Sequence, residues 1–166
     1  MIRLKQILVA TDFSEPSDAA LNYGRELARA FGAHLQILNV VDNLTATMVG
    51  PEGYIGNLTE MQRDVEEAAR KKLGALISNE DRRELGANPI LLTSSTPAYA
   101  IVNQAKEADI DLIVMGTHGR GGFGHLLMGS VAEKVVRSAP CPVLTVRHPE
   151  HEFVLPDALV AIARSA

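Results

Sequence analysis

The sequence predicts a doubly wound α/β domain, in which a parallel five-stranded sheet is covered by helices on both faces. Short apolar runs without alternating polar residues recur along the chain, and such runs are typical of strands buried on both faces. Segments with helical spacing lie between them, and strands that alternate with helices through right-handed crossovers build a parallel sheet. The length of 166 residues corresponds to one such domain.

Five apolar runs supply the predicted strands, and each is too short to be a helix. They are Ile7–Ala10, Leu35–Val41, Ile90–Leu92, Leu112–Met115 and Val143–Val146.

Four helices are expected between the strands. The first begins at Ser14 with Pro16 in its first turn and ends at Gly32, and the third begins at Thr96-Pro97. The second spans about Leu58–Ile77. We expect its apolar stripe to face the sheet, through Val65, Ala68, Ala69, Leu73 and Leu76.

The boundaries of the remaining segments follow from local signals. Ser130 and Glu133 have the spacing of a capping box, which predicts that the last helix starts at Ser130. The connection 42–57 is long enough to be a functional loop, and a passive loop fits equally well. We expect the domain to span residues 1–147, followed by a tail at 148–166 with a short helix from Pro156.

Composition excludes several classes of protein. The 16 Lys and Arg against 20 Asp and Glu give a net charge of −4, which does not favour nucleic acid as the main partner. The single cysteine, Cys141, cannot form an internal disulfide and fits a reducing compartment. No apolar run approaches the ~18 residues of a membrane span. We therefore expect a cytoplasmic protein without a membrane partner.

The most informative segment is 112–133, which runs from the fourth predicted strand through several glycines into the last helix. Backbone without a Cβ atom can approach a phosphate closely, and a helix N-terminus favours an anion. The Ser130 hydroxyl and the N–H groups of Ser130 and Val131 lie where a phosphate would dock. The segment is therefore an anion site in outline.

Two common nucleotide motifs do not fit this segment. Gly119–Gly124 matches G-x-G-x-x-G, but residues 145–147 lack the acidic residue that a dinucleotide fold needs ~20 positions on. A Walker A loop requires Lys and Ser or Thr after its last glycine, where His125 and Leu126 stand. Asp111 begins the fourth strand and lies at the wrong end of the sheet to hold a catalytic metal ion. We therefore do not expect a P-loop ATPase.

The glycine spacing carries a more specific signal. Gly116, Gly119, Gly129 and Ser130 read G-x2-G-x9-G-S, and in this the chain resembles the ATP-binding members of the universal stress protein family. The resemblance covers about Ile2 to Arg147 and includes the segments 9–14, 39–42 and 140–144. It departs at Ala10, where the family often has Pro, and at Ser95, where it often has Gly.

The resemblance implies strand order 3-2-1-4-5 and an ATP site at the carboxyl ends of the first and fourth strands, where connections reverse direction. Asp12 would accept hydrogen bonds from the ribose or adenine, the Val40 backbone would contact the adenine edge, and Met115 would pack near both. Glycines, Ser130 and Val131 would hold the phosphates. The candidate site residues are Ala10, Thr11, Asp12, Val40, Met115, Gly116, His118, Gly119, Arg120, Gly129, Ser130 and Val131.

Several candidates have an alternative role. Asp12 could instead cap the turn that follows the first strand. Arg120 could fork onto phosphate oxygens or face solvent. His118 and His125 could contact phosphate or stabilise their loops.

These observations lead us to expect an ATP-binding stress protein, with Mg²⁺ accompanying the nucleotide, that acts as a nucleotide-dependent regulator or sensor toward a protein partner. The alternatives are a slow ATPase or adenylyl-handling enzyme, and a protein that binds ADP, AMP or cyclic AMP without reading the γ-phosphate. The resemblance also implies a two-fold homodimer formed by antiparallel pairing of strand Val143–Val146. The tail could instead cover that edge.

Overall fold

The computed structural model describes residues 1–47, 55–118 and 128–147. Within these ranges the strands are β1 (Gln6–Ala10), β2 (His34–Val41), β3 (Asn88–Thr93), β4 (Leu112–Gly116) and β5 (Val143–Val146). The helices are α1 (Glu15–Phe31), α2 (Leu44–Thr47), α3 (Ile55–Leu76), α4 (Asn79–Glu84), α5 (Pro97–Glu107) and α6 (Ser130–Ser138).

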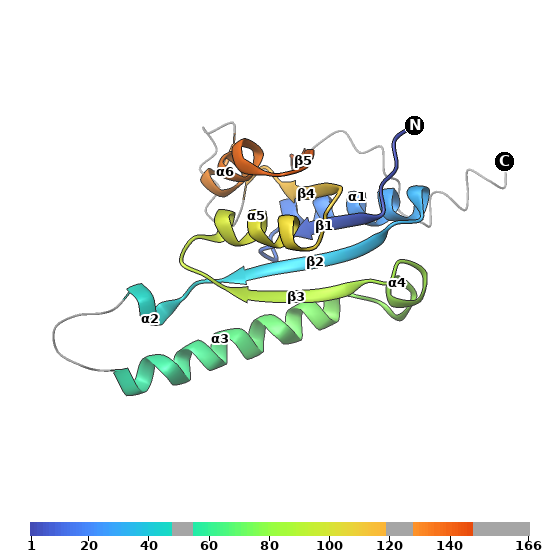
Figure 1. Ribbon diagram of the computed structural model, residues 1–166. Coiled ribbons are helices and arrows are strands. Elements are labelled where there is room, and N and C mark those ends of the chain that lie inside the picture. The colour runs from blue at the N-terminus through green and yellow to red at the C-terminus, as the bar shows by residue number, and fades with distance from the viewer. Residues whose placement is uncertain (48–54, 119–127, 148–166) are drawn as a thin grey trace.

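The five strands form one parallel sheet in the order β3-β2-β1-β4-β5, as expected (Figure 1). Ala10, the last residue of β1, is in register with Leu38 of β2 and with Met115 of β4. The carboxyl ends of these three central strands therefore meet at one edge of the sheet. The connections diverge there, which is where ligands bind in open α/β sheets.

Helices cover both faces of the sheet (Figure 1). On one face, α1 and α3 enclose a core that includes Val9, Ile37 and Leu73. On the other face, α5 and α6 enclose a second core that includes Leu8 and Ile113. Because both faces are buried, the strands read as continuous apolar runs rather than as alternating ones.

The predicted ends of α1 are confirmed. Ser14 is the N-cap, and the capping box closes through Ser17, the N3 residue. Gly32 ends the helix in the left-handed conformation with φ of 64°, which costs little only for glycine. Thr96 is the N-cap of α5 with Pro97 in its first turn, also as expected.

Helix α4 was absent from the sequence prediction because its six residues are all polar and carry no apolar stripe. It is held instead by side-chain bonds: Ser78 caps it through Asp81, and Arg25 of α1 bridges to Asp81 at 3.1 Å. Burial disfavours the charged Asp81 carboxylate, but the Ser78 N–H and the Arg25 guanidinium outweigh this and lower its pKa. Helix α4 is therefore docked electrostatically onto α1.

The predicted inward stripe of α3 is correct only in part. Ala69 and Leu73 are buried, as expected, whereas Ala68 is exposed and Val65 keeps 41% of its surface exposed. The prediction is wrong for Val65 and Ala68 because they border a cavity rather than the core. The short helix α2, in the 42–57 connection, was also not predicted.

Within the described ranges, none of the helices combines the length and hydropathy needed to span a bilayer.

Candidate functional site

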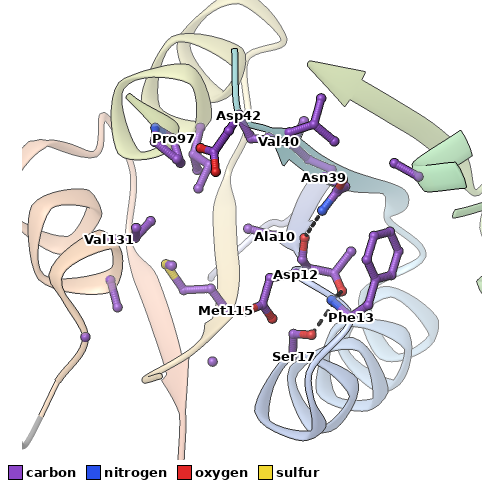
Figure 2. Close-up of a pocket in the computed structure, with 18 of the residues that line it drawn as sticks. Ala10, Asp12, Phe13, Ser17, Asn39, Val40, Asp42, Pro97, Met115 and Val131 are labelled. Carbon is purple, nitrogen blue, oxygen red and sulfur yellow. Dashed lines mark hydrogen bonds between the residues drawn. The ribbon is translucent and has the colours of Figure 1, made fainter. Parts of the chain in front are cut away.

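A cavity of about 760 Å³ lies at the carboxyl edge of the sheet, where β1, β2 and β4 end. Its walls come from both faces of the sheet and from the start of α6, and Figure 2 shows most of the lining side chains. Its volume lies within the range of small-molecule sites. We refer to it as the carboxyl-edge cavity.

One side of the cavity is an apolar slot, defined by Ala10, Val40, Pro97, Met115 and Val131. These residues come from three strands and from the first turns of α5 and α6. Figure 2 shows Met115 and Val131 on the same side of the end of β1. Such walls can hold a flat apolar group, while backbone N–H and C=O groups at the strand ends can fix its orientation.

The turn between β1 and α1 is tied together by side-chain hydrogen bonds. The Thr11 hydroxyl accepts a bond from the Phe13 N–H at 3.0 Å and lies 3.0 Å from the Ser17 hydroxyl. The Ser17 Oγ atom also accepts from the Ser14 N–H. Phe13 has φ of 65°, a conformation that is rare for a bulky residue. The hydrogen bonds around it therefore hold the turn in a conformation that Phe13 would not adopt on its own.

Asp12 sits in this turn and lines the cavity. Its Oδ1 atom accepts hydrogen bonds from the Ser14 N–H at 3.2 Å and from the Ser14 hydroxyl. The capping alternative considered for Asp12 is therefore present in the structure. Capping fixes the carboxylate at the cavity wall, so it does not compete with a contact to a ligand.

Asn39 is a site feature that the sequence prediction did not include. Its side chain is 5% exposed, and its amide donates to the Thr11 carbonyl oxygen at 2.8 Å. Its Oδ1 atom is buried without a hydrogen bond in the described part of the chain. A polar residue near the end of the mostly apolar run 35–41, on the same face of the strand as Leu35 and Ile37, was the signal that could have pointed to it.

The start of α6 forms another wall. Gly129 is the N-cap, and its N–H donates to the Thr117 carbonyl oxygen at 2.7 Å. Helix α6 starts at Ser130, as expected, but the predicted Ser130–Glu133 capping box is wrong, because Ser130 is already the first helical residue. Glu133 instead pairs with Arg137 at 3.0 Å. The Ser130 hydroxyl makes no hydrogen bond within the described residues.

Glycine at position 116 is required by packing. A Cβ atom there would lie 2.9 Å from Pro16 Cβ, closer than real Cβ atoms approach, and 3.0 Å from the Pro16 carbonyl carbon, which is also a tight contact. The first turn of α1 can therefore pack directly on the end of β4.

Charged groups on the wall are few. Carboxylates are contributed by Asp12 and Asp42, which lie on opposite sides of Ala10 in Figure 2, and a cation by Lys72. Burial, with Asp12 nearby, raises the pKa of Asp18 at the start of α1. Asp111 lies at the opposite edge of the sheet, as predicted, where it accepts from the Lys5 and Gln6 N–H groups.

Most of the predicted site residues come together here. Gly119, Arg120 and His125 lie outside the described residues. His118 borders the cavity with Nδ1 3.1 Å from the Thr117 hydroxyl. The candidates on the cavity wall are Ala10, Thr11, Asp12, Val40, Met115, Gly116, His118, Gly129, Ser130 and Val131.

Solved structures with this fold include two nucleotide complexes. One is a universal stress protein in complex with cAMP, 23% identical with a TM-score of 0.56, covering 88% of this chain and 98% of its own. The other, from Archaeoglobus fulgidus, is in complex with dAMP, 23% identical with a TM-score of 0.55, covering 88% and 99%. At this identity the likeness concerns the fold.

Sequence comparisons are more direct. A universal stress protein of Methanocaldococcus jannaschii is 34% identical over 89% of this chain and 85% of its own. One of Thermus aquaticus is 36% identical over 86% and 98%. A solved family member from Burkholderia pseudomallei is 32% identical with a TM-score of 0.65, over 86% and 96%. The model of the universal stress protein family matches residues 3–147. The chain therefore belongs to the universal stress protein family.

Proposed function

We propose that this universal stress protein binds an adenine nucleotide in the carboxyl-edge cavity, with ATP as the main ligand, and acts as a nucleotide-dependent regulator. The observation that carries the proposal is the juxtaposition of the apolar slot with the N-terminus of α6 in one cavity. A nucleotide has a flat base and an anionic phosphate chain. The cavity offers a surface for each, and the two surfaces adjoin at Ser130 and Val131.

The base would lie in the apolar slot, between Val40 and Met115, with its edge on the backbone of β2. The ribose would lie near Asp12, whose Oδ1 atom is fixed by Ser14 and whose carboxylate can accept from a hydroxyl. The cAMP and dAMP complexes of proteins with this fold support an adenine nucleotide as the ligand class.

The phosphates would lie at Gly129 and Ser130, where the first N–H groups of α6 have no partner inside the helix. Gly119 and Arg120, from the same motif, would contribute as the family pattern implies. Mg²⁺ would be held mainly by the phosphate oxygens, as is usual for this ion in nucleotide sites. Bound ATP would order this end of the molecule and change the surface offered to a protein partner in the cytoplasm.

The proposed homodimer uses strand β5, which lies at the edge of the sheet and pairs only with β4 in the described structure. The side chains of Val143 and Leu144 on this edge are half-buried. Pairing with a second copy of the strand would satisfy the backbone N–H and C=O groups that the edge leaves unpaired. Sedimentation of the full chain tests this proposal: a monomer at micromolar concentration contradicts it.

Thermal unfolding with ATP, ADP, AMP and cyclic AMP, each with and without Mg²⁺, tests the nucleotide proposal. A ligand at a hundred times its dissociation constant adds about 2.7 kcal/mol to the free energy of unfolding, which is a measurable shift in the midpoint. We expect ATP to give the largest shift and Ser130→Ala to reduce it. The matched control is Ser138→Ala, at the other end of α6. The absence of a shift with every adenine nucleotide would contradict the proposal.

A further inference from the structure

The carboxyl-edge cavity continues past the end of β1 onto the face of the sheet that α1 and α3 cover. Alternate residues of β2 point to opposite faces, so Asn39 lies on the α3 side and Val40 on the side of the apolar slot. Figure 2 shows Asn39 and Phe13 across the end of β1 from Met115. We call this part the α3 compartment and define it by Phe13, Asn39, Val65, Ala68 and Lys72.

The wall contributed by α3 is apolar and open. Val65 is 41% exposed although it belongs to the same helical stripe as the buried Ala69 and Leu73. Met61, one turn earlier, is 48% exposed and extends this stripe. An apolar stripe that leaves the core and borders a cavity is a surface suited to an apolar ligand. From Val65 to Lys72 the helix advances about 10 Å, which sets the length of that surface.

The charge of the compartment is carried by Lys72. Its ammonium group lies 5.5 Å from the centroid of the Phe13 ring, and no carboxylate among the described residues is within ion-pair distance of it. Its neighbour Lys71, in contrast, pairs with Glu67 at 2.7 Å on the outside of α3. Asn39 Oδ1, in the wall, is an acceptor and would repel an anion. An anionic head would therefore lie at Lys72 and away from Asn39.

We propose that the α3 compartment binds an amphipathic monoanion of the medium-chain fatty acid class. The carboxylate pairs with Lys72, and the acyl chain lies along Val65 and Ala68. A single ammonium group without a cradle of backbone N–H groups suits one carboxylate better than a polyphosphate. The nucleotide of the proposed function would occupy the apolar slot on the other face, so this proposal does not depend on it.

Calorimetric titration of the full-length protein with decanoate, decanol and decyltrimethylammonium, all below their micelle concentrations, tests the proposal. We expect decanoate to bind best and the cationic ligand worst. Lys72→Gln should weaken decanoate binding about fivefold, which is the contribution of one partly exposed ion pair, and leave decanol binding unchanged. Lys72→Arg should retain decanoate binding. The matched control is Lys71→Gln, which removes a neighbouring lysine outside the cavity.

Two further variants address the apolar wall. Ala68→Phe should fill the compartment and abolish binding of both decanoate and decanol. Val65→Asp should repel decanoate, whereas Val136→Asp, at a similarly exposed position on α6, should not. Val65 and Ala68 are both exposed, so their variants should fold. Circular dichroism and the thermal midpoint check this.

Three outcomes would overturn the proposal. The first is the absence of decanoate binding to the full chain. The second is an equal loss in Lys71→Gln and Lys72→Gln. The third combines two observations: a ligand of the apolar slot displaces decanoate, and Ala68→Phe does not weaken decanoate binding. That result would place decanoate in the apolar slot instead. If ATP does not bind but decanoate does, with the predicted variant pattern, the nucleotide proposal alone fails.

Discussion

The side-chain amide of Asn39 on β2 donates a 2.8 Å hydrogen bond to the carbonyl oxygen of Thr11, the residue that follows β1. Thr11 in turn accepts from the Phe13 N–H through its hydroxyl, and Phe13 adopts a positive φ. The Asn39 amide therefore holds the end of β1 in the position from which the turn to α1 begins. Asp12 is placed on the cavity wall by that turn.

Two replacements of Asn39 should separate the contribution of its hydrogen bond to stability from the cost of burying a polar group. Asn39→Leu removes the donor to Thr11 but also removes a buried unsatisfied oxygen, so we expect a loss of about 1 kcal/mol at most. Asn39→Asp places a buried carboxylate against the Thr11 carbonyl and should cost about 3 kcal/mol at neutral pH. Urea unfolding at pH 7 and pH 4 measures both. Protonation restores a donor, so part of the loss in Asn39→Asp should be recovered at pH 4.

Gly116 and Gly74 should respond in opposite ways to replacement by alanine. At Gly116 a Cβ atom meets Pro16 at 2.9 Å, so Gly116→Ala should cost about 1–3 kcal/mol by overpacking. At Gly74, in the interior of α3, nothing lies within 4 Å of the added atom. Gly74→Ala should stabilise the protein by up to about 1 kcal/mol through helix propensity. Equal effects in chemical denaturation would show that packing against Pro16 is not what requires glycine at 116.

The sequence predicted the architecture well because the central strands are buried on both faces. Runs such as Leu112–Met115 therefore carry an unambiguous signal, and the ends of α1 were marked by Ser14 and Gly32. Strand order came from family resemblance, since no local pattern encodes which strands are neighbours.

The sequence prediction was wrong or incomplete at segments whose structure depends on contacts between elements distant in the sequence. The pattern on α3 does not distinguish a residue that faces the core from one that faces a cavity, so Val65 was placed in the core. Helix α4 depends on the pair Arg25 and Asp81, which are far apart in sequence. The hydroxyl at Ser130 and the carboxylate at Glu133 suggested a cap, but the chain enters α6 one residue earlier.

The buried Asp81 should make stability depend on acid pH. Its pKa is lowered from 3.8 in the folded state, so its stabilising contribution is present above pH 3.8 and is lost as the pH falls below that value. Asp81→Asn should cost about 2 kcal/mol at pH 7, the value of hydrogen bonds to a charged group, and less at pH 3. Urea unfolding at both pH values measures this. Glu67→Gln, which breaks an exposed pair with Lys71, should leave stability unchanged at either pH.

Ser130→Ala should leave the stability of the free protein unchanged and weaken nucleotide binding. If Ser130 capped α6 through a capping box, its loss would cost about 1 kcal/mol. Because Gly129 is the N-cap and the Ser130 hydroxyl makes no hydrogen bond within the described residues, we expect a change within about 0.5 kcal/mol. A phosphate at the start of α6 would accept from this hydroxyl, so the ATP dissociation constant should rise about fivefold to tenfold. Thermal unfolding without ligand and calorimetric titration with ATP measure the two effects, and Ser138→Ala should change neither. A loss of stability without a loss of affinity would mean that the hydroxyl serves the helix and not the ligand.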